Sequence, residues 1–159
     1  MKLEEIKSLI LIWGMISKEA IEQLKVEFLY HKGLYILVPE MRPYLLGLAV
    51  SKNLKNSRIR HIYATDNMLG YLFYKNKIKK MLFFYKEITP SGAVGICGSL
   101  YACLLSSLHN VPIKLLKGGI ESNSLEDKDA STINGNLFIN DPGLAIEAKD
   151  ELVPWEILK

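Results

Sequence analysis

Three apolar, strand-like stretches in the middle of the chain each end in a short polar cluster, and a fourth cluster opens a predicted helix. In an open parallel sheet the carboxyl ends of the strands lie along one edge, and ligands bind in the crevice beyond them. The repeated order of apolar stretch and polar cluster therefore predicts that four scattered positions form one site. In chain order the clusters are Glu40-Met41-Arg42-Pro43, Asp66-Asn67, Lys86-Glu87 and Cys97-Gly98-Ser99.

Predicted strands and helices alternate from residue 34 onward. The predicted strands are residues 34–38, 60–64, 78–85 and 111–116. Helices predicted to begin at Pro43, Asp66 and Ser99 separate them, because proline suits the first turn of a helix and aspartate suits an N-cap. Such alternation is typical of a doubly wound sheet. We therefore predict an α/β fold, a three-layer, Rossmann-like open sheet that is mainly parallel and has helices on both faces.

The beginning of the chain is predicted to be helical. Apolar side chains recur at spacings of three and four over residues 3–16, which is helical periodicity. Ser17 is placed to cap a second short helix, and from Val26 the pattern is extended. We therefore divide the chain into an N-terminal helical segment, residues 1–25, and a Rossmann-like domain, residues 26–159.

Three further segments carry local signals. Pro90-Ser91-Gly92 is a turn sequence. The polar residues 121–136 are predicted to form a long loop. Pro154-Trp155-Glu156-Ile157 opens at most one helical turn near the end of the chain.

Composition limits the class of protein. A chain of 159 residues can bury the core of one α/β domain, and two full domains would be small. The apolar fraction of 49% favours a further apolar surface covered by self-association, so we expect a homodimer or a pairing with a paralog. The net charge of +3, from 20 basic and 17 acidic residues, is too small for the basic footprint of nucleic-acid-binding proteins. The sequence does not support nucleic acid as a partner.

Cysteine usage and hydropathy bear on the compartment. Cys97 and Cys103 lie six residues apart in one predicted helix start, which is poor geometry for a disulfide. A reducing, cytoplasmic setting is the simplest interpretation. The apolar run of residues 8–16 is far shorter than the roughly 20 residues that span a bilayer, so no membrane association is predicted.

Several motifs, taken in their order and approximate spacing, resemble one known family. They are Glu40-Met41-Arg42-Pro43 with Gly47, Ile62-Tyr63-Ala64-Thr65-Asp66 before a helix with Gly70, Gly92-Ala93-Val94, Gly98-Ser99, and His109-Asn110-Val111-Pro112. This series resembles the C-terminal domain of the translation initiation factor 2B alpha/beta/delta group. That superfamily also includes methylthioribose-1-phosphate isomerase and archaeal ribose-1,5-bisphosphate isomerase. The resemblance covers residues 26–116 and extends to the ending, residues 150–157.

The resemblance implies a Rossmann-like domain that dimerises, usually after a helical N-terminal domain that is almost entirely missing here. The positions that serve isomerase chemistry in the family differ in this chain. No cysteine precedes Cys97, and a glutamine of the isomerases falls on Leu46. The family's Gly-Ala-Asp falls on Phe84-Tyr85-Lys86, and an Asn-Lys pair becomes the shortened Gly95-Ile96-Cys97. These four losses argue against the isomerase reaction.

Five residues are predicted to bind a ligand at the strand ends. Glu40 and Arg42 flank one residue, so their side chains point to the same side of an extended segment. They are predicted to contact an anion or a ribose, or else to form a structural ion pair. Asp66 is predicted either to bind ligand or to cap the following helix. Gly98 and Ser99 open a helix, and the N–H groups and dipole there attract anions.

Two residues are weaker catalytic candidates. Lys86 could act with Glu87 as an acid/base pair, or could belong to a solvated, ion-paired edge. Cys97 could be a thiolate activated by the helix dipole, or a buried, inert thiol. The histidines and cysteines show no metal-ligand spacing, so neither a metal nor a cofactor is predicted.

These observations favour a non-catalytic protein that resembles initiation factor 2B. Its predicted work is regulatory or protein-binding, as a dimer that senses a phosphorylated metabolite or nucleotide. Two alternatives stay open. One is a sugar-phosphate isomerase or related enzyme with altered catalytic residues, and the other is a structural partner of a longer paralog.

Overall fold

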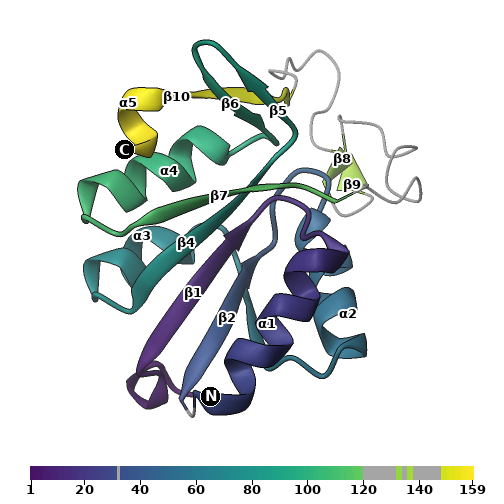
Figure 1. The fold of residues 1–159 in the computed structure, drawn as a ribbon, viewed down its shortest axis with the longest axis vertical. Helices are drawn as coiled ribbons and strands as arrows, with labels where there is room; N and C mark the ends of the chain where they lie inside the picture. The colour runs from purple at the N-terminus through teal and green to yellow at the C-terminus, as the bar shows by residue number, and fades with distance from the viewer. Residues whose placement is uncertain (32, 120–131, 134–135, 138–147) are drawn as a thin grey trace.

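Five parallel strands form the central sheet of the computed structural model, in the order β3-β2-β1-β4-β7 (Figure 1). The structure describes residues 1–31, 33–119, 132–133, 136–137 and 148–159. The strands are β1 (Ser8–Trp13), β2 (Leu34–Pro39), β3 (His61–Ala64), β4 (Ile78–Tyr85) and β7 (Ile113–Lys117). The strand order reverses at β1, which pairs with both β2 and β4. The predicted α/β class with a mainly parallel sheet is confirmed.

Helices cover both faces of this sheet, as predicted. His61 of β3 lines up with Ile10 of β1 through Ile36 of β2, whereas Met81 of β4 pairs with Leu11 of β1. Since neighbouring residues of a strand point to opposite faces, His61 and Met81 lie on opposite faces of the sheet. Ser51 and His61 form a hydrogen bond of 2.7 Å between Oγ and Nε2, and Ser106 Oγ donates to Met81 Sδ at 3.1 Å. The helix that carries Ser51 therefore lies on one face, and the helix that carries Ser106 lies on the other. The helices are η1 (Leu3–Glu5), α1 (Lys18–Tyr30), α2 (Leu46–Asn56), α3 (Met68–Tyr74), α4 (Ser99–Leu108) and α5 (Trp155–Leu158).

Several observed strands and helices begin and end close to the predicted residues. The strand predicted over residues 34–38 is β2, the strand over residues 78–85 is β4, and the helix over residues 99–108 is α4. Ser17 caps α1, accepting a hydrogen bond from the Ala20 N–H at 3.2 Å. Among the described helices, none is long and apolar enough to cross a membrane.

The prediction of a helix over residues 3–16 is wrong, and so is the helical segment of residues 1–25 as a separate unit. Residues 8–13 form β1, the centre of the sheet, with Leu9, Leu11 and Ile12 fully buried. A central parallel strand is buried on both faces and therefore reads as a continuous apolar run. Such a run also contains apolar residues three and four apart, so periodicity alone does not distinguish the two structures.

Two local boundaries near the first helices are also corrected. Residues 26–30, predicted to be extended, form the last turns of α1, which ends at Tyr30. The helix predicted from Pro43 begins three residues later, at Leu46, because residues 42–45 form turns and Leu45 has a left-handed backbone. Residue 45 therefore stands outside the helix and redirects the chain into it.

A small antiparallel sheet, absent from the prediction, stands beside the central one in the order β10-β6-β5 (Figure 1). Its strands are β5 (Glu87–Thr89), β6 (Gly92–Gly95) and β10 (Glu151–Pro154). The predicted turn at Pro90-Ser91-Gly92 joins β5 to β6. The end of the chain pairs with β6, and α5 forms the predicted single helical turn after it. The loop predicted over residues 121–136 falls mostly outside the described residues, which include there only β8 (Thr132–Ile133) and the first residue of β9 (Asn136–Leu137).

Candidate functional site

The predicted site residues do follow the carboxyl ends of their strands. Glu40 and Arg42 come directly after β2, Asp66 follows β3, and Lys86 follows β4. The first turn of α4 is joined to this edge by Trp13, the last residue of β1. A Cβ atom built on Gly98 would stand only 2.5 Å from Cζ2 of Trp13. The fold therefore brings the four clusters toward one edge of the sheet.

Asp66 holds the loop that follows β2 and does not cap α3. Its carboxylate accepts hydrogen bonds from the backbone N–H groups of Met41, at 2.8 Å, and Arg42, at 2.9 Å. The N-cap position of α3 belongs to Asn67, whose side chain makes no capping bond. The N-cap interpretation of Asp66 is therefore wrong. The carboxylate instead satisfies two backbone donors of a loop in which Met41 has a positive φ of 56°.

Glu40 and Arg42 form an ion pair, as one of the two interpretations expected. Arg42 Nε lies 2.9 Å from the Glu40 carboxylate, and the two side chains are 33% and 15% exposed. The hydrogen bond to Glu40 raises the pKa of Arg42, against the effect of burial. Nearby, burial raises the pKa of Tyr63, and the charges of Glu40 and Asp66 raise it further. The predicted contact of Arg42 with a ligand anion stays a prediction.

The N-terminus of α4 already holds a carboxylate of the same chain. Glu151 accepts hydrogen bonds from the backbone N–H groups of Gly98, at 2.9 Å, and Leu100, at 3.0 Å. Ser99 is buried, and its hydroxyl donates to the carbonyl of Ile96 at 2.6 Å. An external anion at Gly98 and Ser99 would therefore have to displace Glu151. Sequence reasoning missed Glu151 because 51 residues separate it from Leu100 and no local pattern joins them.

The environment of Cys97 does not favour an activated thiolate. Burial raises the pKa of the Cys97 thiol above its ordinary value, and the charge of Glu151 and its hydrogen bond to the thiol raise it further. The charges of Asp66 and Asp150 act in the same direction. The helix dipole that would stabilise a thiolate is opposed by these carboxylates. The raised pKa argues against an activated thiolate, and Cys97 is half-buried rather than buried as the second interpretation expected.

Lys86 forms an ion pair across the small sheet. Its Nζ lies 3.1 Å and 3.2 Å from the two carboxylate oxygens of Asp150. The side chains are 38% and 50% exposed, so the pair is partly solvated. This geometry agrees with the interpretation of Lys86 as part of a solvated, ion-paired edge. The ammonium group is paired with a carboxylate of the same chain. Among the described residues, no group of histidine, cysteine and carboxylate side chains could hold a metal ion.

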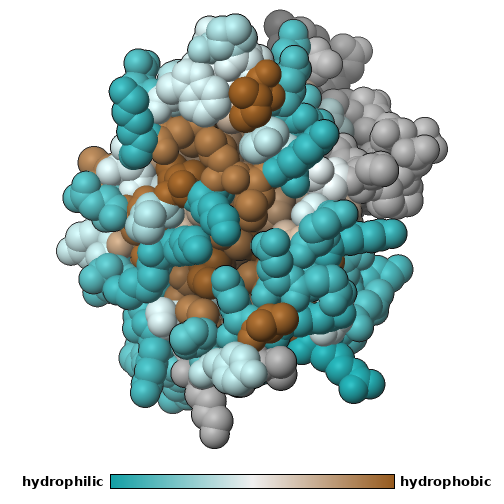
Figure 2. Space-filling model, in the orientation of Figure 1, coloured by the Kyte–Doolittle hydropathy of each residue, from teal (hydrophilic) through white to brown (hydrophobic). Residues whose placement is uncertain are grey.

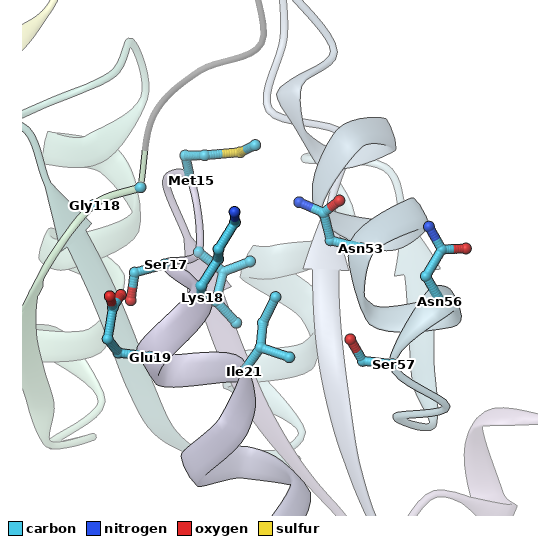
Figure 3. Close-up of a pocket in the computed structure, with 11 residues that line it drawn as sticks. Met15, Ser17, Lys18, Glu19, Ile21, Asn53, Asn56, Ser57 and Gly118 are labelled. Atoms are coloured by element: carbon cyan, nitrogen blue, oxygen red, sulfur yellow. The ribbon is translucent and has the colours of Figure 1, made fainter.

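A cavity of about 590 Å³ lies elsewhere, between the first turn of α1 and the last turn of α2. Figure 3 shows Glu19 on α1 with its N-cap residue Ser17, and Asn53 and Asn56 on α2 with its C-cap residue Ser57. The Lys18 side chain lies between the two helices. Ile21 and Gly118 also line the cavity. Its size suits a small ligand. None of the predicted site residues lines it, and the sequence analysis singled out only Ser17 among its residues, as a helix cap.

Comparisons with known proteins identify a matching family model and several similar folds. The sequence model of the initiation factor 2 subunit family matches residues 3–115. The structure is similar to translation initiation factor eIF-2B, subunit delta, from A. fulgidus, with a TM-score of 0.75 and 14% identity over 95% of this chain and 50% of that chain. It is also similar to 5-methylthioribose 1-phosphate isomerase from Pyrococcus horikoshii OT3, with a TM-score of 0.75 and 13% identity over 96% of this chain and 48% of that chain.

A third similar structure is translation initiation factor eIF-2B from Pyrococcus horikoshii OT3, with a TM-score of 0.68 and 17% identity over 96% of this chain and 55% of that chain. This chain therefore spans about half the length of these structures. A search of curated proteins finds no significant match. The structural similarities show the fold, and they include both initiation factors and an isomerase.

Proposed function

The chain belongs to the initiation factor 2 subunit family, and we propose that it is a non-catalytic, protein-binding member that acts as a homodimer. One observation carries the non-catalytic part of this proposal. Three charged groups at the strand-end edge are engaged with groups of the same chain. Arg42 pairs with Glu40, Lys86 pairs with Asp150, and Glu151 binds the first turn of α4. General acid/base chemistry needs a titratable group available to substrate.

An exposed apolar surface supports the protein-binding part. Two helices on the same face of the sheet expose large side chains. They are Met68, Tyr71 and Tyr74 of α3, and Tyr101, Leu104 and Leu108 of α4. Figure 2 shows apolar residues gathered in the middle of the view, where Figure 1 draws strands β4 and β7 of the central sheet. Large apolar surfaces on soluble proteins mark interaction sites, and a second copy of this chain is the partner that we propose.

A phosphorylated metabolite or nucleotide is the ligand that we propose for the strand-end edge. Two features support it. The first turn of α4 offers backbone N–H groups to oxygen anions, as its contact with Glu151 demonstrates. Arg42 provides a guanidinium group that is one-third exposed, and arginine suits phosphate geometry. The ligand would modulate the dimer and would not be converted.

Sedimentation velocity on the wild type and on Leu108→Lys tests the dimer. Leu108 is 74% exposed, so a lysine there should leave the monomer fold intact while placing a charge in the interface. The matched control is Val26→Lys, a change of an exposed apolar residue on α1. We expect a dimeric wild type, a dimeric Val26→Lys variant and a Leu108→Lys variant shifted toward monomer. A monomeric wild type at all concentrations contradicts the homodimer and leaves a paralog as the partner to test.

An isomerase assay tests the alternative. The protein is incubated with 5-methylthioribose 1-phosphate and with ribose 1,5-bisphosphate, and the sugar products are followed by NMR. We expect no conversion above that of buffer. Conversion that disappears in Lys86→Ala or Cys97→Ser would show an enzyme with altered catalytic residues and would overturn the non-catalytic assignment.

A further inference from the structure

The cavity between α1 and α2 is lined by polar side chains that have no partner within the described part of the chain. Lys18 and Glu19 of α1 line it together with Asn53 and Asn56 of α2 (Figure 3). Among the described residues, none of these four side chains forms a hydrogen bond or an ion pair. At the strand-end edge, by contrast, three charged groups are engaged within the chain. The donors and acceptors of the cavity are therefore open to a bound molecule.

The charged groups of the cavity are one ammonium and one carboxylate. Of the described residues that line it, Lys18 and Glu19 are the two with charged side chains, and their charges sum to zero. Consecutive residues of an α-helix point about 100° apart. Figure 3 accordingly shows Lys18 between the two helices and Glu19 on the side of α1 that faces away from α2. A ligand that reaches both groups has a negative and a positive end that are separated from each other.

The two asparagines add groups that both donate and accept hydrogen bonds. Asn53 and Asn56 lie three residues apart on α2, so they share one face of the helix. Each carboxamide has an acceptor oxygen and an NH₂ group with two donors. A peptide group offers the matching pair, one N–H and one C=O. The carboxamides therefore suit a ligand with a peptide group between its charged ends.

The remaining lining is largely apolar. Met15, Ile16 and Ile21 line the cavity and are buried in the fold. Covering the apolar surface that they present to the cavity favours a ligand with apolar side chains. The volume of about 590 Å³ lies in the range of sites for small organic molecules, and a single inorganic ion would leave most of it unfilled.

We propose that the cavity between α1 and α2 binds a short zwitterionic peptide with apolar side chains. The peptide carboxylate pairs with Lys18, and its ammonium group pairs with Glu19. The carboxamide of Asn53 bonds its peptide group, and an apolar side chain of the ligand packs on Ile21. This site is separate from the strand-end edge and from the exposed surface of α3 and α4, because no residue named there lines the cavity.

Calorimetric titration with the dipeptide alanyl-leucine tests the charge recognition. Two probes of similar size each lack one charge: N-acetyl-alanyl-leucine has no ammonium group, and alanyl-leucinamide has no carboxylate. We expect the wild type to bind the dipeptide at least about tenfold more tightly than either analogue, because each analogue loses one charge-assisted contact.

Two variants assign the two ends of the ligand. Lys18→Met should weaken binding of the dipeptide at least about tenfold without weakening that of alanyl-leucinamide, which has no carboxylate to lose. Glu19→Gln should weaken the dipeptide without weakening N-acetyl-alanyl-leucine. The matched control is Lys52→Met, a change of an exposed lysine of α2 that does not line the cavity. It should bind the dipeptide as the wild type does.

The methyl group of Met15 reports where the peptide binds. In protein labelled with ¹³C at the methionine methyl groups, the dipeptide should shift the Met15 resonance, which Met15→Leu identifies by its loss. The resonance of Met68, on α3, should stay in place.

Three results would overturn the inference. They are no binding of the dipeptide at millimolar concentration, binding that leaves Met15 unshifted, and binding of N-acetyl-alanyl-leucine as tight as that of the dipeptide. The proposed homodimer is judged separately by sedimentation of Leu108→Lys, since neither Lys18→Met nor Glu19→Gln alters α3 or α4. Failure of the peptide site and failure of the proposed function are therefore distinguishable.

Discussion

The carboxylate of Asp66, at the end of β3, accepts a hydrogen bond of 2.9 Å from the backbone N–H of Arg42, beyond the end of β2. A second bond, from the N–H of Met41, completes the bridge. Two neighbouring parallel strands are thereby tied at their carboxyl ends, and the loop that carries the Glu40–Arg42 ion pair is held over the edge of the sheet. The position of this ion pair therefore depends on a residue 24 positions later in the chain.

Asp66→Ala should destabilise the protein by about 1–3 kcal/mol, because two backbone donors lose a charged acceptor. Urea denaturation measures this as a lower midpoint with an unchanged slope. Asn67→Ala is the matched control, since Asn67 makes no capping bond, and it should change stability by less than about 0.5 kcal/mol. Equal effects of the two substitutions would show that the Asp66 bridge contributes no stability.

Gly98→Ala should be far more disruptive than Gly33→Ala. Both glycines have a positive φ, 89° and 90°, so both substitutions carry the backbone cost of about 1 kcal/mol. A Cβ at Gly98 also meets Cζ2 of Trp13 at 2.5 Å, whereas the nearest atom at Gly33 is 3.8 Å away on a flexible lysine. We expect an additional loss of about 1–3 kcal/mol at Gly98, measured by thermal denaturation with near-ultraviolet circular dichroism of tryptophan. Similar losses at both positions would contradict the close packing of Trp13.

Stability should fall as the pH rises from about 9 toward 12. Burial raises the pKa of Cys103 from 9.0 to about 12, so over this range the unfolded thiol ionises while the folded one keeps its proton. The folded state then binds more protons than the unfolded state, and the stability present below pH 9 is lost at up to about 1.4 kcal/mol per pH unit. Urea denaturation at several pH values should show a smaller alkaline loss for Cys103→Ala. An unchanged slope in that variant would assign the loss to other groups, of which Tyr63 also has a raised pKa.

Asp150→Asn should change stability by less than about 1 kcal/mol. Its ion pair with Lys86 is partly solvated, with the two side chains 38% and 50% exposed, and exposed pairs contribute little. Chemical denaturation of Asp150→Asn and of Lys86→Met, with the double variant, measures the coupling energy. A coupling above about 2 kcal/mol would mean that this pair, and not only Glu151, anchors β10.

The elements predicted well are those whose local signals agree with their burial. The apolar run of residues 34–38 is strand β2, and Ser99 to Leu108 is helix α4. The helix prediction for residues 3–16 was wrong because β1 lies in the middle of the sheet. Burial on both faces there removes the alternation of apolar and polar residues that marks a strand. The positions of the candidate site residues were predicted in part for a similar reason. Glu40, Arg42, Asp66 and Lys86 follow strand ends, which a sequence can indicate, whereas the intramolecular partners of Lys86 and Gly98 lie more than 50 residues away.

The sequence by itself determined the alternation of strands and helices, and with it the α/β class and the edge at which polar residues gather, because these depend on local hydrophobic pattern and turn chemistry. Only the tertiary structure decided which groups meet at that edge. Pairing of β10 with β6 brings Glu151 to α4 and Asp150 to Lys86, and a contact between distant segments leaves no periodic mark in either one. The physical reason is that hydrogen bonds and ion pairs act over a few ångströms in space, irrespective of the number of residues that separate the partners along the chain.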